Sequence, residues 1–83
     1  MLDEFFRQQE IERNRLIGKL FRTAERNEFE LAIPISVKFN TMRNEWIYQV
    51  YFPMATVYRE WAEHSILSRL NQTDQGFEKW TEL

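Results

Sequence analysis

The segment that decides the fold is residues 29–54, FELAIPISVKFNTMRNEWIYQVYFPM, in which two alternating apolar runs flank a short polar turn. Successive side chains of a β-strand point to opposite faces, so apolar residues at every second position build one apolar face. The segment therefore predicts a β-hairpin with a single apolar face. Its members are Phe29, Leu31, Ile33, Ile35, Val37 and Phe39 in the first strand, and Trp46, Tyr48, Val50, Phe52 and Met54 in the second.

The apolar residues also predict how the two strands pair. A register that places Val37 opposite Trp46, and Ile35 opposite Tyr48, matches every apolar residue across the ladder. This register leaves a loop of about four residues at 40–43. A register displaced by two residues keeps the same faces and is the alternative.

The two edges of this hairpin differ. Proline has no N–H to donate, so Pro34 must lie with its nitrogen away from the partner strand and closes the outer edge of the first strand. The second strand has no such residue from Glu45 to Phe52, and its outer edge is open to a further strand. We therefore expect the second strand to bind a protein partner or a second copy of the chain, through Ile47, Gln49 and Tyr51.

Helical spacing of apolar residues predicts a helix on each side of the hairpin, over 2–26 and 56–71, followed by a docked tail over 72–83. Gln9 and Arg13 interrupt the apolar stripe of the first helix. Two explanations are open: the helix extends beyond the sheet there, or a polar patch contacts the helix of a second copy.

Together these elements predict a single small α+β domain over residues 1–83, in the order α-β-β-α. An antiparallel hairpin, with strands over 28–39 and 44–54, would be covered on one face by both helices. A chain of 83 residues buries a small core, and a two-stranded sheet is marginal alone. We therefore expect a homodimer that extends the sheet.

The composition excludes several classes of protein. The chain has no cysteine and one histidine, which disfavours disulfides and zinc sites, and we expect no metal and no cofactor. A net charge of −2 disfavours generic attraction to nucleic acid or to anionic membranes. No apolar run approaches the ~20 residues that span a bilayer. The acidic pair Asp3 and Glu4 is unlike a signal peptide, so we expect a cytoplasmic protein.

The single histidine is the one candidate for catalysis. Glu60 precedes His64 by four residues, which would place both on one face of the predicted second helix. The sequence offers neither a second metal ligand at a recognisable spacing nor a nucleophile on another element. We therefore expect a non-catalytic protein.

Basic residues recur at helical spacing in the predicted first helix. A basic helix face can follow a phosphate backbone, so a nucleic-acid-binding module is the alternative function. Our leading hypothesis is a small interaction protein, such as a regulator, an inhibitor or an accessory subunit, that binds another protein; a virus-encoded inhibitor would fit. The charged side of the first helix would add to the contacts in either case, through Arg15, Lys19, Arg22 and Arg26.

Overall fold

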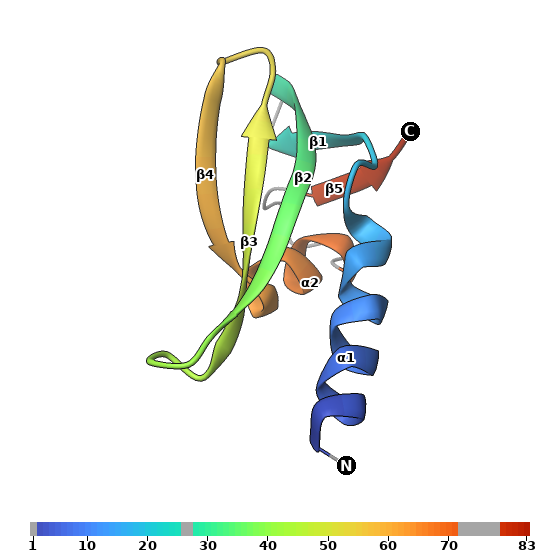
Figure 1. Cartoon of the computed structure of the whole chain (residues 1–83). Helices are drawn as coiled ribbons and strands as arrows, with labels where there is room; N and C mark the ends of the chain where they lie inside the picture. Colours follow the sequence, from blue (N-terminus) through green and yellow to red (C-terminus); the bar gives the residue numbers. More distant parts are fainter. Residues whose placement is uncertain (1, 26–27, 72–78) are drawn as a thin grey trace.

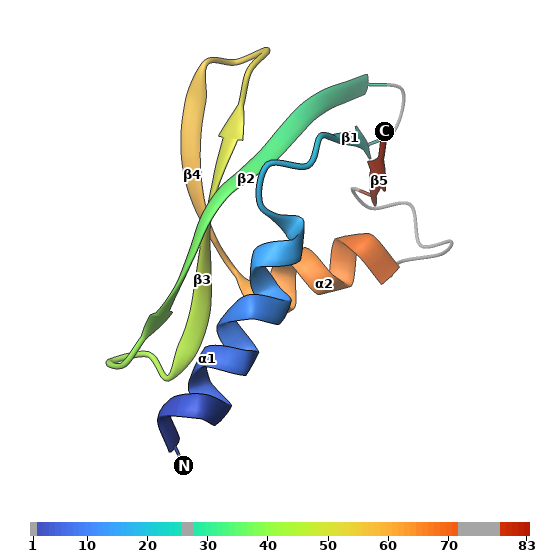
Figure 2. The same cartoon turned by 45° about the vertical axis from the view of Figure 1, so that its right-hand side comes forward.

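The computed structural model describes residues 2–25, 28–71 and 79–83 (Figures 1 and 2). In chain order the elements are α1 (Leu2–Arg13), the short 3₁₀ helix η1 (Asn14–Leu16), β1 (Phe21–Glu25), β2 (Glu28–Asn40), β3 (Glu45–Phe52), β4 (Val57–Ala62), α2 (Glu63–Asn71) and β5 (Lys79–Glu82). In this described part the strands form one antiparallel sheet in the order β4-β3-β2-β1-β5. The predicted α+β class is confirmed, but the predicted order α-β-β-α is replaced by a longer series of elements.

The long strand β2 organises the sheet. Its first part, up to Ala32, pairs with β1, and its second part, from Ile33 onward, pairs with β3. A β-bulge lies between Pro34 and Ser36, near the point where one partner replaces the other. Bulges bend a strand, and Figure 2 shows β2 curving from the β1–β5 part of the sheet to the β3–β4 part.

The bulge changes which side chains of β2 face the core. Pro34 pairs with Val50 and Ser36 pairs with Gln49, so Ile35 is an extra residue with no partner of its own in β3. Leu31 and Ile33, before the bulge, consequently point to one side of the sheet, whereas Val37 and Phe39, after it, point to the other. Ile35 is 38% exposed, whereas Val37 is 7% exposed. The predicted single apolar face is therefore wrong for the first half of β2.

From Ser36 to Asn40 the hairpin has the register that we gave as the alternative, whereas before the bulge Ile33 pairs with Tyr51, one residue from the predicted pairing. Trp46 pairs with Phe39, not with Val37, which is the predicted pairing displaced by two residues. The loop keeps the predicted length but covers Thr41–Asn44, and its last residue has a φ of 53°. Asparagine tolerates this left-handed conformation better than most residues, which suits it to that position.

The predicted first helix is wrong beyond Leu16. Gly18 has a φ of 83°, which glycine adopts without strain, and its N–H donates to the carbonyl of Pro34 at 2.8 Å. The chain then turns into β1, which pairs with the first half of β2. Backbone groups in that half of β2 need partners, and this requirement outweighs the helical spacing of residues 20–26.

The predicted second helix is wrong before Glu63. Residues 57–62 form β4, and Thr56, with a φ of 57°, lies in the turn that connects β3 to β4. β4 pairs with β3 from Ile47 to Phe52. The edge that we expected a partner to occupy is therefore filled by the chain itself. Val57, Tyr58 and Trp61 have side chains that favour strands, and this tertiary pairing outweighs their helical spacing.

The core lies on the inner face of the sheet, which we define as the face that carries Ala32, Val37 and Val50. α2 contacts β3, β4 and β5 there. No helix of the described ranges is long and apolar enough to cross a membrane. The buried apolar residues are Phe21, Ala32, Val37, Trp46, Tyr48, Val50, Phe52, Ile66 and Trp80.

The end of the chain is part of this core. β5 pairs with β1, and its Trp80 ring lies 5.8 Å from Phe21 and 5.6 Å from Trp61, measured between ring centroids. Docking of the tail is therefore seen for residues 79–83. The remainder of the predicted tail, residues 72–78, lies outside the described residues.

Candidate protein-binding surface

Apolar side chains occupy one end of the outer face of the sheet, opposite the core. Ile33, Tyr51 and Tyr58 form one row across β2, β3 and β4. The two tyrosine rings lie 4.7 Å apart at 38° to each other, and Tyr58 is 60% exposed. Ile35 lies next along β2, and Leu31 pairs with the exposed Arg22 of β1 on the same face. We name this set the outer patch: Leu31, Ile33, Ile35, Tyr51 and Tyr58.

The outer patch exists because of the β2 bulge. Ala32 and Pro34 fill the inner positions of this stretch and are almost fully buried. Their odd-numbered neighbours must therefore point outward, although they are large and aliphatic. Contiguous apolar groups on the exposed side of a sheet mark surfaces that contact other molecules.

The other half of the outer face is polar and hollowed. Ser36, Gln49 and Glu60 form the row beside the outer patch, and the next row contains Lys38, Ile47 and Ala62. A groove of about 330 Å³ runs across these rows. Lys38 lines one side of the groove and Glu60 lines the other. Neither makes an ion pair with any residue of the described ranges.

The structure brings together the three binding residues predicted on the second strand. Ile47, Gln49 and Tyr51 alternate along β3 and all lie on the outer face. They lie in the middle of a sheet, between β2 and β4, and not along a free edge. The surface that they share is therefore the outer face of the sheet and not a strand edge.

The predicted basic helix face does not form. Arg15 lies in η1, whereas Lys19 follows it and contacts Glu82 of β5, with 3.0 Å between Nζ and Oε1. Arg22 lies in β1, and Arg26 lies outside the described residues. Arg15, Lys19 and Arg22 therefore do not lie along one helix face, which is the arrangement on which the nucleic-acid alternative was based.

Sequence reasoning missed four members of the outer patch. Leu31, Ile33 and Ile35 were assigned to the core, and Tyr58 to a helix. A signal was present: Ala32 and Pro34 are also apolar, so the first half of this strand has apolar residues at both odd and even positions. Alternation cannot decide which face is buried in such a segment.

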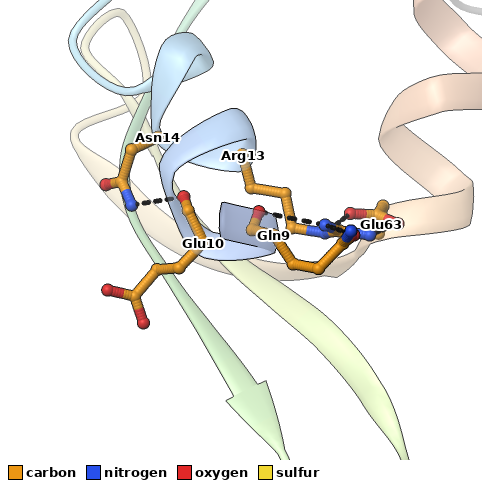
Figure 3. A network of polar contacts seen from close by, with 5 residues as sticks. All are labelled: Gln9, Glu10, Arg13, Asn14 and Glu63. Atoms are coloured by element: carbon orange, nitrogen blue, oxygen red, sulfur yellow. Dashed lines mark hydrogen bonds and ion pairs between the residues drawn. The ribbon is translucent and has the colours of Figure 1, made fainter. Parts of the chain in front are cut away.

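A polar network connects α1 to α2 (Figure 3). The Arg13 guanidinium forms an ion pair with Glu63, with 3.1 Å from Nη2 to Oε1, and its Nη1 donates to the carbonyl and side-chain oxygens of Gln9. The same guanidinium lies 4.7 Å from the ring of Trp46. The polar interruption of the first helix is therefore a contact between two helices of one chain. This contact positions α1 against α2, and neither Arg13 nor Glu63 contributes to the outer face.

The inner face carries one group with a shifted acidity. Burial of the Tyr48 phenol, together with the nearby carboxylate of Glu63, raises the pKa of Tyr48 to about 12. A raised pKa keeps the phenol protonated in the folded state, so its contribution to stability is present below pH ~10 and is lost as the pH rises toward 12. Tyr48 therefore acts as a neutral core residue at physiological pH.

The structure separates His64 from its predicted partner. Glu60 lies in β4 and His64 in α2, so they do not share a helix face. The His64 side chain is exposed, and its Nδ1 lies 3.9 Å from Oε2 of Glu45. In the described part of the chain, no group of three or more potential ligands is placed to hold a metal ion.

Comparison with family models, with curated proteins and with solved structures finds no match to this chain. The candidate site is therefore defined by its own geometry: an apolar outer patch continuous with a polar groove that lies between the cationic Lys38 and the anionic Glu60.

Proposed function

We propose that the chain is a small, non-catalytic interaction protein that binds another protein through the outer patch. Such a protein acts as a regulator, an inhibitor or an accessory subunit by occupying its partner's surface. We also propose that it works in the cytoplasm and as a homodimer. The observation that carries the proposal is the outward position of Leu31, Ile33 and Ile35, which the β2 bulge imposes.

The chemistry of the outer face supports this function. Tyrosine offers a large, rigid contact area with a polar end, and aromatic residues are enriched at protein interfaces. Tyr51 and Tyr58 lie close enough to hold each other in place, at 4.7 Å between ring centroids. A polar rim beside an apolar centre is the usual arrangement of a protein interface, and Gln49, Lys38 and Glu60 supply that rim.

Site-specific photo-crosslinking tests this function. A photoreactive phenylalanine analogue at Tyr58, in the outer patch, should form covalent adducts with protein in cells that express the chain. The matched control carries the same analogue at Met42, which is 95% exposed in the β2–β3 loop. Adducts should form at position 58 at several times the yield at position 42, since a bound surface holds its partner in place. Equal yields at the two positions, or no protein adduct at position 58, would refute the proposed function.

A further inference from the structure

We propose that the outer face binds a second copy of this chain, face to face, about a two-fold axis that runs along β3. This inference rests on the proposed function, because it names the occupant of the same protein-binding surface: in the dimer the second copy covers the outer patch, and a different protein binds there only by displacing that copy. The two sheets would form a sandwich in which each outer face is covered by the other. Aligned packing of this kind places two sheets about 10 Å apart with their strands about 30° from parallel.

The outer face is asymmetric in two properties at once. Its β2 side carries the aliphatic residues of the outer patch and the cationic Lys38. Its β4 side carries the aromatic Tyr58 and the anionic Glu60. The aliphatic residues thus lie across β3 from an aromatic residue that could pack on them, and the cation lies across β3 from an anion.

A two-fold axis along β3 joins these complements. It places β2 of one copy over β4 of the other, so Ile33 and Ile35 cover the partner's Tyr58, and Tyr51 meets the partner's Tyr51. Lys38 and Glu60 lie one row apart in the sheet, since they neighbour Ile47 and Gln49 respectively. One row is ~7 Å along a strand and packed sheets lie ~10 Å apart, so the two backbones are ~12 Å from each other, a gap that a lysine and a glutamate side chain span together. Each copy then forms one ion pair from Lys38 and one from Glu60.

Other symmetric contacts fit this surface less well. An axis across the strands would place β2 over β2 and β4 over β4, so Lys38 of one copy would not face Glu60 of the other, and both charges would be desolvated without a partner. Antiparallel pairing of two β4 edges must match residues of the same face, which in the two central registers sets Arg59 against Arg59 or Glu60 against Glu60. Like charges directly opposite in a ladder are destabilising.

The test is the mass of charge-reversed variants in solution, alone and mixed. Lys38→Glu and Glu60→Lys each create two repulsive contacts in the proposed dimer and should raise its Kd by about tenfold or more. In an equal mixture, each ion pair of a mixed dimer joins opposite charges again. The mixture should therefore form dimers that contain one copy of each variant, which native mass spectrometry resolves by mass.

The control is Arg7→Glu, an exposed change of the same charge in α1, which should leave dimerisation unchanged. The inference is overturned if the wild-type chain is monomeric, if either variant alone dimerises as well as the wild type, or if mixing fails to restore dimers. A monomeric chain whose position 58 still crosslinks to a different protein overturns this inference and leaves the proposed function standing. Absence of any adduct at position 58 overturns the proposed function itself.

Discussion

Replacing Trp80 with alanine should lower the free energy of unfolding by about 3–5 kcal/mol, the usual cost of truncating a buried tryptophan. Trp80 is 2% exposed, although only three residues of the sequence follow it. Its ring contacts Phe21 of β1, Phe52 of β3 and Trp61 of β4, so one side chain joins both parts of the sheet. A domain of this size has a total stability of roughly 4–12 kcal/mol, so this change removes a large share of it.

The measurement is urea unfolding followed by far-UV circular dichroism, which does not depend on the fluorescence of the deleted ring. The control is Phe5→Ala, since Phe5 is 66% exposed on α1 and its truncation should cost no more than about 0.5 kcal/mol. If Trp80→Ala costs less than about 1 kcal/mol, β5 is not docked in the core as the structure shows.

Substitution of glutamate at two neighbouring residues of β2 should lower the free energy of unfolding by very different amounts. Ala32→Glu places a carboxylate at a fully buried position opposite Phe21 and should cost at least about 3 kcal/mol. Ile33→Glu points outward at the outer patch and should cost about 1 kcal/mol or less. This is the reverse of what the alternation of apolar residues predicts, because it places Ile33 in the core and Ala32 on the polar face.

Which of the two variants loses more stability shows which of the two residues faces the core. Strand propensity alone would make Ile33→Glu the costlier change, because isoleucine favours strands and alanine does not, so it cannot explain a larger loss at position 32. The comparison should be made at low protein concentration, so that any association through the outer face does not add to the stability of the wild type. A greater loss for Ile33→Glu than for Ala32→Glu would contradict the observed position of β2.

The parts of the fold that were predictable are those with a strong and consistent local pattern. From Val37 onward, β2 and β3 alternate cleanly, so the hairpin and its loop length follow from the sequence. The register was restricted to two choices that keep the same faces, and parity alone cannot separate them. In the observed register Phe39 pairs with Trp46, and Phe6 of the distant helix α1 packs on both rings, a contact that the local pattern does not contain.

The errors share one cause, which is that strand pairing overrides helical spacing. Residues 21–25 and 57–62 have apolar groups spaced as in a helix, yet each segment pairs with a strand whose backbone groups would otherwise lack partners. Gly18 and Thr56, both at positive φ, lie in the turns that lead the chain into β1 and β4 respectively. A single glycine and a single threonine are weak sequence signals for a turn, so neither turn could be recognised before the sheet was known.

The candidate site was predictable in part. The parity of β3 correctly placed Ile47, Gln49 and Tyr51 on a common face away from the core. Their neighbours on β2 were not predictable, because the extra residue of a bulge leaves no mark when both parities are apolar. Tyr58 lies beside them only because β4 pairs with β3. The helical spacing of residues 56–70 gives no sign of that pairing.

Thiol labelling of single-cysteine variants tests the central claim, that β2 changes its exposed side at the bulge, most directly. The chain has no cysteine of its own, so each introduced thiol reports one position. At a concentration where copies are separate, the account predicts that Ile35→Cys reacts nearly as fast as the exposed control Lys38→Cys. It predicts that Val37→Cys reacts at least about tenfold more slowly, because its reaction requires opening of the core. Equal protection at positions 35 and 37, which an uninterrupted strand would give, would contradict the account.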